Sequence, residues 1–474
     1  MEFIQIYDEG VSQYAYLIGS DKTREAIIID PQRNIHEYLA LAERKNLRII
    51  AATETHIHAD FLSGMQEFIA NTPVQAYLSE HGKDQGWGYD WVKNQKNIKF
   101  IKDGDRITVG DIHLDIVHTP GHTPEHITFM VTEGDNTLPL GAVTGDFVFA
   151  GDLGRPDLLE SAAKLEGEMK KGAATLFKTA QMFKNKPDSL MVWPGHGAGS
   201  ACGKSLGNIP YSTWGYEKQT SPALQFDKEE DFTDFITSDQ KEPPLYFARM
   251  KHHNNKGTKL LDDQKQFQVL SALEFSQKLT DSKDIQVIDT RTDRNAAMKS
   301  RVSGSFYASF PSLSTAVGSM VEDAEQQIIL IVDEDNAGIA RRRLQNIGYD
   351  NVTAFVTPKT LALYFEHYGT PEPIETTDFA SINDDIQAGR LNIVDVRSAS
   401  EYQEAHIDKA IHAPYTRLPE FTDQLPKNET LYVHCGSGAR AAVATSHLAA
   451  SGYKVILVND SFANARSLSV QKTG

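Results

Sequence analysis

Cysteine is rare in this 474-residue sequence, which contains two, Cys202 and Cys435. Two thiols so far apart along the chain do not form a disulfide framework, and we expect both to be reduced. The sequence has no apolar run of the roughly 18 residues that a membrane-spanning helix needs. Its first residues, MEFIQIYDEG, lack the basic start and long apolar stretch of a signal peptide. These absences predict a cytoplasmic protein without a membrane partner.

The sequence also has fewer positively charged residues than negatively charged ones. It contains 47 Lys and Arg residues and 64 Asp and Glu residues, which gives a net charge of −17. A surface with this excess of negative charge argues against nucleic acid or an anionic membrane as the partner. Hydrophobic residues make up 40% of the sequence and charged residues 23%, which are ordinary values for globular domains. At roughly 150 residues per domain, the length predicts about three domains.

The first half of the sequence has an α/β pattern. Short strands precede a predicted helix over residues 34–46 and a buried strand over residues 47–53. Strands, turns and helices then alternate to about residue 250. The polar stretch KHHNNKGTK, residues 251–259, is predicted to be a linker with His252 and His253 exposed.

The second half contains an internal repeat. The segment IQVIDTR (285–291) is similar to LNIVDVR (391–397), and GYDNVTAF (348–355) is similar to GYKVILVN (452–459). Two copies of one small α/β domain explain this pattern, with a junction near YGTPEPIETTD. The expected domains are residues 1–255, 262–370 and 374–474.

Four clusters in the first 200 residues carry histidine or aspartate in turns. They are THIHADF with His56, His58 and Asp60, TPGHTPEH with His122 and His126, TGD with Asp146, and WPGHG with His196. Histidine nitrogens and carboxylate oxygens are common ligands of iron and zinc, and adjacent glycines let the backbone aim a side chain. Each histidine alone would be an ordinary core or surface residue, but the set together indicates a metal site.

These clusters, within THIHADFLSG, HTPGHTPEHITF, TGDFVFAGDLGRPD and PGHG, resemble the metallo-β-lactamase superfamily over roughly residues 1–250. Within it they particularly resemble the persulfide dioxygenases and the glyoxalase II hydrolases. The resemblance implies an αβ/βα sandwich with the metal at one edge of the two sheets. It also implies one Fe(II) per chain on His56, His122 and Asp146, with open positions for substrate and oxygen.

Phe61 bears on the number of metal ions. In the two-metal hydrolases of this superfamily, an aspartate and the histidine after it supply the second site, whereas Asp60 is followed here by a side chain without a lone pair. We therefore expect one metal. His58, Asp60 and His196 would then orient the ligands or bond to iron-bound water.

Two points about the metal stay open at the level of sequence. A single zinc on His56, His58 and His122 is also compatible with these residues, and the residue types do not distinguish iron from zinc or manganese. His126 is interpreted as an ordinary polar residue at the start of the next strand.

Cys202 lies six residues after His196 in the glycine-rich stretch GHGAGSACGKSLGN, which indicates a flexible loop beside the metal edge. One interpretation is a thiol that carries or attacks a persulfide sulfur, with Lys204 favouring the thiolate. The other is a buried cysteine without a chemical role.

The motif YVHCGSGARAA (432–442) contains a six-residue loop between a strand and a helix that begins near Arg440. The loop residues are Cys435, Gly436, Ser437, Gly438, Ala439 and Arg440. A loop at a helix N-terminus stabilises an anion such as a thiolate or a persulfide, and Arg440 adds positive charge.

This loop, with VDVRSASEYQEAHIDKAIHAPY (394–415), resembles the rhodanese sulfurtransferases. The resemblance implies that Cys435 becomes persulfidated. A similar loop in one class of tyrosine phosphatases is longer by one residue, so the six-residue loop here favours sulfur over phosphate as the group that it binds. The first copy has VDEDNAGIARRR (332–343) at this place and no cysteine, so we expect a pseudo-rhodanese domain that acts as a spacer or docking surface.

The whole chain thus resembles a persulfide dioxygenase–pseudo-rhodanese–rhodanese fusion of the bacterial sulfide-detoxification type. The resemblance implies oxidation of a low-molecular-weight persulfide by O₂ to sulfite, and sulfur transfer through Cys435 to sulfite to give thiosulfate. It also implies a homo-oligomer. The alternatives are a glyoxalase II-like thioester hydrolase, a non-enzymatic persulfide sensor, and a sulfurtransferase with a degenerate first domain. The thiol that carries the persulfide stays open.

Overall fold

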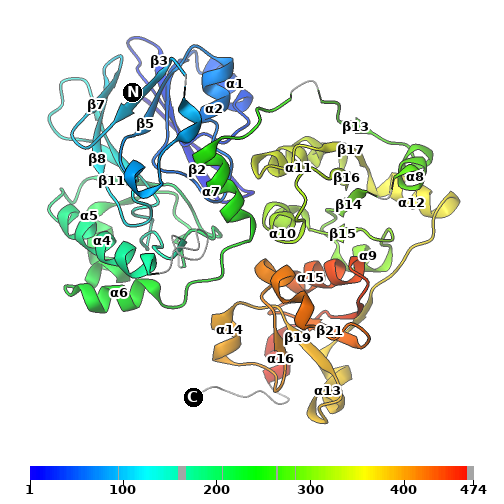
Figure 1. Cartoon of the computed structure of the whole chain (residues 1–474). Helices are drawn as coiled ribbons and strands as arrows, with labels where there is room; N and C mark the ends of the chain where they lie inside the picture. Colours follow the sequence, from blue (N-terminus) through cyan, green and yellow to red (C-terminus); the bar gives the residue numbers. More distant parts are fainter. Residues whose placement is uncertain (94, 159–166, 205, 263–264, 283, 467–474) are drawn as a thin grey trace. The chain divides into compact units, whose positions relative to one another are not determined.

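The chain forms two compact units, Met1–Leu261 and Asp262–Gly474, each built around two β-sheets (Figure 1). The computed structural model describes the whole chain except residues 94, 159–166, 205, 263–264, 283 and 467–474. The domain boundaries expected from the sequence stay predictions, because the second unit holds both of its sheets in one compact body.

The first unit is a sandwich of two six-stranded sheets, and both sheets mix parallel and antiparallel strands. The first sheet has the order β1 (Glu2–Asp8), β2 (Gln13–Gly19), β3 (Glu25–Ile29), β4 (Arg48–Thr53), β5 (Gln75–Ser79), β6 (Ile98–Ile101). The second has the order β12 (Ser212–Thr213), β11 (Met191–Pro194), β10 (Gly141–Gly145), β9 (Ile127–Glu133), β8 (Ile112–His118), β7 (Arg106–Val109).

Helices cover the outer faces of both sheets, and alternation along the strands explains why. On β2, Ala15 and Leu17 pack in the cluster under α1 (His36–Arg44) and α2 (Met65–Asn71). The next residues, Tyr16 and Ile18, belong to the cluster between the two sheets, since successive side chains of a strand point to opposite faces. A third cluster joins the second sheet to helices α4 (Glu168–Phe183), α5 (Trp214–Thr220) and α6 (Glu229–Thr237). The expected αβ/βα sandwich is confirmed.

The linker predicted over residues 251–259 is wrong. Residues Tyr246–Lys256 form helix α7, with Asn254 and Asn255 buried, and His253 partly buried; His252 alone of the two histidines is exposed. The asparagines donate hydrogen bonds to backbone carbonyls of neighbouring loops, including those of His58 and Gly88. The polar composition that suggested solvent exposure is thus paired inside the fold.

The second unit contains two five-stranded parallel sheets with the same strand order, as the repeat predicted. The first copy has the sheet β13 (Gln268–Val269), β17 (Val352–Val356), β16 (Gln327–Ile331), β14 (Ile285–Asp289), β15 (Phe306–Tyr307). The second has β18 (Glu375–Thr377), β22 (Lys454–Val458), β21 (Thr430–His434), β19 (Asn392–Asp395), β20 (Ile411–His412). Their helices are α8 (Ala272–Asp281), α9 (Arg294–Lys299), α10 (Leu313–Met320), α11 (Glu334–Asn346), α12 (Pro358–His367), α13 (Phe379–Gln387), α14 (Ala399–Glu404), α15 (Ala439–Ala450) and α16 (Phe462–Arg466).

The two copies repeat a local hydrogen-bond pattern as well as a topology. Arg291 Nε donates to Asp289 at 2.9 Å, and Arg397 Nε donates to Asp395 at 2.9 Å. In each copy the aspartate of this Asp-x-Arg stretch is the last residue of a strand, β14 in the first copy and β19 in the second. The repeat seen in the sequence is therefore a structural duplication.

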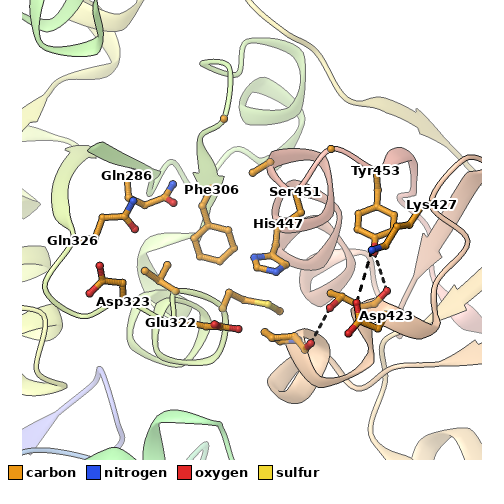
Figure 2. Close-up of a pocket in the computed structure, with 17 residues that line it drawn as sticks. Gln286, Phe306, Glu322, Asp323, Gln326, Asp423, Lys427, His447, Ser451 and Tyr453 are labelled. Carbon is orange, nitrogen blue, oxygen red and sulfur yellow. Dashed lines mark hydrogen bonds and ion pairs between the residues drawn. The ribbon is translucent and has the colours of Figure 1, made fainter. Parts of the chain in front are cut away.

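The two copies also pack against each other inside the second unit. The Tyr307 backbone N–H of β15 donates to Ser446 Oγ of α15 at 2.9 Å. Beside this contact lies a cavity of about 630 Å³ lined by both copies, in which the rings of Phe306 and His447 lie 6.2 Å apart (Figure 2). In the part of the chain that the structure describes, no helix is both long and apolar enough to cross a membrane.

Candidate metal centre and cysteine loop

The polar clusters of the first unit converge at one edge of the sandwich because their loops leave neighbouring strand ends. The segment with His56 follows β4, Asp146 follows β10, and His196 follows β11. His122 lies in the connection between β8 and β9. The carboxyl ends of strands commonly gather functional side chains in this way.

Three side chains present their ligand atoms to a common point. His56 Nε2 lies 3.9 Å from Asp146 Oδ2, and His122 Nε2 lies 3.6 Å from the same oxygen. All three side chains are buried, and Asp146 Oδ2 has no hydrogen-bond partner among the described residues. A buried carboxylate oxygen facing two imidazole nitrogens suits a metal cation. The structure thus brings together the predicted ligands His56, His122 and Asp146.

Hydrogen bonds on the far side of each ring fix which nitrogen faces the centre. His122 Nδ1 lies 2.9 Å from the Arg155 carbonyl, which can only accept, so Nδ1 carries the proton and Nε2 keeps its lone pair. His56 Nδ1 lies 2.9 Å from Thr55 Oγ1. Burial lowers the pKa of both His56 and His122, so both rings are neutral and able to bind a metal.

His196 lies between two carboxylates. Its Nδ1 is 2.8 Å from Asp146 Oδ1, and its Nε2 is 2.9 Å from Asp60 Oδ2. Burial opposes the charge on this ring, but the two carboxylates outweigh it and raise the pKa of His196 well above its usual value. The pKa of Asp146 is lowered, because the charge of His196 and its hydrogen bond outweigh the effect of burial. His196 therefore donates to both Asp146 and Asp60 and orients the carboxylate of the expected ligand.

His58 stands apart from the three convergent ligands. Its Nε2 lies 3.1 Å from Asp30 Oδ1, its Nδ1 has no partner among the described residues, and its ring packs 4.3 Å from that of Phe61. Asp30 also accepts a hydrogen bond from the Thr55 backbone N–H at 2.6 Å. His58 belongs to neither group of converging ligand atoms in the described residues. This geometry favours the set with Asp146 over a zinc set with His58.

Cys202 is 2% exposed and lies with Asp60 and His196 in a second group of converging ligand atoms. Burial, together with the charges of Asp60 and Asp146, raises the pKa of its thiol well above the usual value, so the thiol is protonated. The expectation that Lys204 favours the thiolate is wrong, because Lys204 Nζ donates to the Phe235 carbonyl at 2.7 Å. Cys202 is nevertheless next to the candidate metal centre, as its sequence position predicted.

Several residues that hold this centre were not identified in the sequence, and His126 is the clearest. It was interpreted as an ordinary polar residue, but it is fully buried. Its Nε2 accepts from the Asp146 backbone N–H at 3.0 Å, and its Nδ1 lies 2.8 Å from Thr119 Oγ1. His126 therefore positions the backbone that carries a ligand. The local signal was its spacing of four from His122.

Arg155 joins the metal centre to the Cys202 loop. Its carbonyl accepts from His122, and its Nη1 donates to the Ala201 carbonyl at 2.9 Å. Its guanidinium is buried in an ion pair with Asp157, with Nε–Oδ1 at 2.8 Å and Nη2–Oδ2 at 2.6 Å. Arg155 lies within the motif TGDFVFAGDLGRPD, but the motif alone gives it no role, because that role depends on contacts between distant loops.

The cysteine loop of the second copy has the predicted position. Cys435 directly follows β21, is 1% exposed, and precedes α15, which begins at Ala439. Gly438, at the helix start, has φ of +85°, and a Cβ there would lie 2.5 Å from Asn459 Oδ1, so glycine is required.

Arg440 is less available to a substrate than the sequence suggested. Its Nη1 and Nη2 bond to the two carboxylate oxygens of Glu401 at 2.6 and 2.7 Å. Burial raises the pKa of Glu401, but the bonds and charge of Arg440 outweigh this and lower it to about 2. Arg440 therefore lies at the loop as one half of an ion pair.

In the first copy, strand pairing identifies the residue at the place of the cysteine. Asp289 pairs with Ile331, and Asp395 pairs with His434, so Val332 corresponds to Cys435. Val332 is buried and followed directly by the acidic start of α11. The first copy therefore has the isopropyl side chain of a valine where sulfur would be carried.

Comparison with known proteins agrees with this geometry. The family model of the metallo-beta-lactamase superfamily matches residues 8–196, and that of the rhodanese-like domain matches residues 378–467. A solved metallo-beta-lactamase from Staphylococcus aureus subsp. aureus COL is 38% identical, with a TM-score of 0.66, and the match covers 76% of this chain and 99% of that one. The chain belongs to the metallo-β-lactamase superfamily. It also carries a C-terminal rhodanese domain.

Curated relatives of the metallo-β-lactamase unit have more than one activity. "Persulfide dioxygenase ETHE1, mitochondrial" of Bos taurus is 29% identical over 40% of this chain and 66% of its own length. "Hydroxyacylglutathione hydrolase cytoplasmic" of Arabidopsis thaliana is 29% identical over 46% of this chain and 85% of its own length. This chain thus spans less than two thirds of the dioxygenase. Membership of the superfamily and the buried group of His56, His122 and Asp146 support a metal-dependent enzyme.

Proposed function

We propose that the chain is a persulfide dioxygenase coupled to a sulfurtransferase. In the first reaction, R–S–SH + O₂ + H₂O gives R–SH + SO₃²⁻ + 2 H⁺. In the second, sulfite takes the outer sulfur of a Cys435 persulfide and gives thiosulfate. The observation that carries the proposal is a buried group of two histidines and one carboxylate on the same chain as a rhodanese cysteine loop.

His56, His122 and Asp146 would hold one Fe(II) per chain. The unpaired Oδ2 of Asp146 and the two neutral Nε2 atoms fit a cation, and three protein ligands leave further positions open. Bound Fe(II) would supply the redox chemistry by which O₂ accepts the electrons that the persulfide gives up. Hydrogen bonds to the Arg155 carbonyl and to Thr55 fix the orientation of the His122 and His56 rings.

The residues around this group would control protons and access. His196 holds protons on Nδ1 and Nε2 between Asp146 and Asp60, which keeps the ligand carboxylate ionised. Cys202 offers a neutral thiol beside Asp60, close to the expected place of the persulfide. The ligands are buried, so the reacting sulfur would be shielded from bulk water.

The transfer step uses a second molecule of the persulfide. The Cys435 thiolate attacks the outer sulfur of this R–S–SH, so that Cys435–S–S⁻ forms as the R–S–S bond breaks and R–SH leaves. Sulfite attacks the outer sulfur of Cys435–S–S⁻, its new S–S bond forms as the persulfide bond breaks, and the electron pair stays on Cys435 as thiolate. The N-terminus of α15 lies directly after the loop, and its dipole favours an anion there. The first reaction supplies the sulfite that the second consumes.

A second candidate function is thioester hydrolysis of the glyoxalase II kind, which relatives named hydroxyacylglutathione hydrolase favour. It would use metal-bound water, and the group of Asp60, His196 and Cys202 would have to hold a second ion. Phe61 argues against it, because it lies where the hydrolases of this superfamily have a ligand.

Metal analysis combined with O₂ uptake distinguishes the two candidates. We expect one iron per chain and O₂ consumption on a low-molecular-weight persulfide, with sulfite as the first product. Two zinc ions per chain and turnover of a thioester without oxygen would overturn the proposal in favour of hydrolysis. Coenzyme A, cysteine, glutathione and bacillithiol persulfides should be compared, because the residues do not identify the thiol.

Replacement of the cysteine tests the coupling. Cys435→Ser should consume O₂ at the wild-type rate but release sulfite in place of thiosulfate, measured with both products quantified after reaction. Glu334→Ser, in the exposed corresponding segment of the first copy, is the matched control and should leave the product ratio unchanged. Thiosulfate formation at the wild-type level in Cys435→Ser would contradict a required role for the loop.

A further inference from the structure

Helix α9 of the cysteine-less first copy reaches the cysteine loop of the second copy. Arg294 Nη2 donates to the Ser437 carbonyl at 3.3 Å, and the same nitrogen would lie 3.1 Å from a Cβ on Gly438. The neighbouring Asn295 accepts from Asn459 Nδ2 at 2.8 Å, across the same boundary. Arg294 thus contacts the loop of the other copy, and Asn295 contacts Asn459, which lies beside Gly438 of that loop.

This contact belongs to a larger interface inside the second unit. Strand β15 of the first copy packs on α15, the helix that begins at the loop. The hydrogen bond from the Tyr307 N–H to Ser446 Oγ is buried in this interface. Arg294 is therefore held near the loop by packing as well as by its own hydrogen bond.

Arg294 differs from Arg440, the other cation at the loop, because no ion pair neutralises its charge in the described residues. Arg440 is bonded to Glu401 through both of its terminal nitrogens. Arg294 has no carboxylate within ion-pair distance among the described residues, and its Nε is buried without a hydrogen-bond partner. The two guanidiniums flank the loop, with Arg440 Nη2 3.3 Å from a Cβ on Gly436 and Arg294 beside Gly438.

We propose that Arg294 is a residue of the sulfur-transfer site of the second copy, where its guanidinium binds the anionic sulfur acceptor. This inference rests on the proposed function for the identity of the anion, which is sulfite before the transfer and thiosulfate after it. Sulfite carries two negative charges and the Cys435 persulfide carries one. A cation at the loop that has no carboxylate partner lowers the repulsion between these two anions. The first copy has no cysteine of its own and supplies this cation.

Alkylation of Cys435 in the full chain tests the charge without requiring any turnover. Iodoacetate is an anion and iodoacetamide is a neutral molecule of similar size, and mass spectrometry of the Cys435 peptide separates its modification from that of Cys202. At roughly 7 Å and an effective dielectric constant of about 40, one lost positive charge lowers the rate of the anion by about 5- to 10-fold. We therefore expect Arg294→Gln to lower the iodoacetate-to-iodoacetamide rate ratio by this factor.

Two further variants separate charge from fold. Arg294→Lys should keep most of the wild-type ratio, because it retains the cation. Lys299→Gln removes an exposed charge from the other end of the same helix and should leave the ratio unchanged. An unchanged ratio in Arg294→Gln, or equal slowing with both reagents, would overturn the inference. A wild-type Cys435 that reacts with neither reagent would also overturn it, since such a loop admits no small anion.

Sulfur transfer to sulfite gives the second readout. Arg294→Gln should raise the KM for sulfite by about 5- to 10-fold, with a smaller change in kcat, and added salt should reduce the difference from wild type. If the wild-type chain transfers no sulfur, the proposed function fails while the alkylation ratio still decides the role of Arg294. The two failures are therefore distinguishable.

Discussion

Asn254→Ala is the perturbation that best tests how helix α7 supports the metal centre. The Asn254 side chain donates to the carbonyls of His58 and Phe61 at 2.8 and 2.7 Å, and it accepts from the Ser63 N–H at 2.9 Å. These three bonds hold the segment from His58 to Ser63, which follows the candidate ligand His56. The asparagine is 6% exposed, so solvent does not replace them easily.

The destabilisation expected for Asn254→Ala follows from the number of polar groups that the substitution leaves without a hydrogen-bond partner. Each hydrogen bond contributes about 1 kcal/mol net, and a buried group without a partner costs about 1–3 kcal/mol. Loss of all three predicts a destabilisation of about 3–5 kcal/mol. For a unit of this size, this lowers the midpoint of thermal unfolding by about 10 °C. Loosening the segment should also weaken metal binding by about 10-fold.

The assay is thermal unfolding of the full chain with metal titration and elemental analysis of the purified variant. His252→Ala is the matched control, because His252 is exposed on the same helix, and it should behave like wild type. Wild-type unfolding and metal content in Asn254→Ala would refute this reasoning, and α7 would then be a peripheral helix. Alkylation of Cys435 should be unaffected, which confirms that the second unit is intact.

Three more predictions concern acid, backbone space and the metal. Burial lowers the pKa of the His447 imidazole to about 4. As the pH falls, this imidazole therefore gains its proton in the unfolded chain before it does so in the folded one. The free energy of unfolding of the second unit should decrease by about 3 kcal/mol as the pH falls from about 6.5 to about 4. His447→Gln should flatten that part of the stability-versus-pH curve, measured by denaturant unfolding. A Cβ on Gly154 would lie 1.7 Å from the Asp146 carbonyl, so Gly154→Ala should lose most of its bound metal in elemental analysis. Removal of the metal by a chelator should lower the unfolding midpoint of the first unit and leave that of the second unchanged, as calorimetry can resolve.

The sequence was most informative where residues act through local motifs. His56, Asp146 and His196 each follow a strand within a few residues, and strand ends of one sandwich edge lie together by topology. The duplicated Asp-x-Arg segments likewise predicted two copies of one fold, since both the strand order and the hydrogen bonds recur. In these cases the spacing along the chain carries the spatial information.

The parts that could not be predicted depend on contacts between segments far apart in the sequence. Asn254 lies in a polar stretch whose composition is typical of a linker, and only its bonds to residues near position 60 make it part of the core. Arg294 lies in a copy without a cysteine, and no property of that copy alone indicates a role at the loop of the other. Lys204 was assigned to the nearby thiol, but it extends to the Phe235 carbonyl instead.

The two cysteines have opposite electrostatic surroundings, and this limits what each can carry. Cys202 lies by Asp60 and Asp146, whose charges together with burial favour the neutral thiol. A persulfide anion attached there would be repelled by the same carboxylates unless a bound cation compensates for them. Cys435 lies at a helix N-terminus with the Arg440 and Arg294 guanidiniums beside its loop. An anionic sulfur is therefore better stored on Cys435, while Cys202 is suited to donate a proton or to bind a substrate through its neutral form.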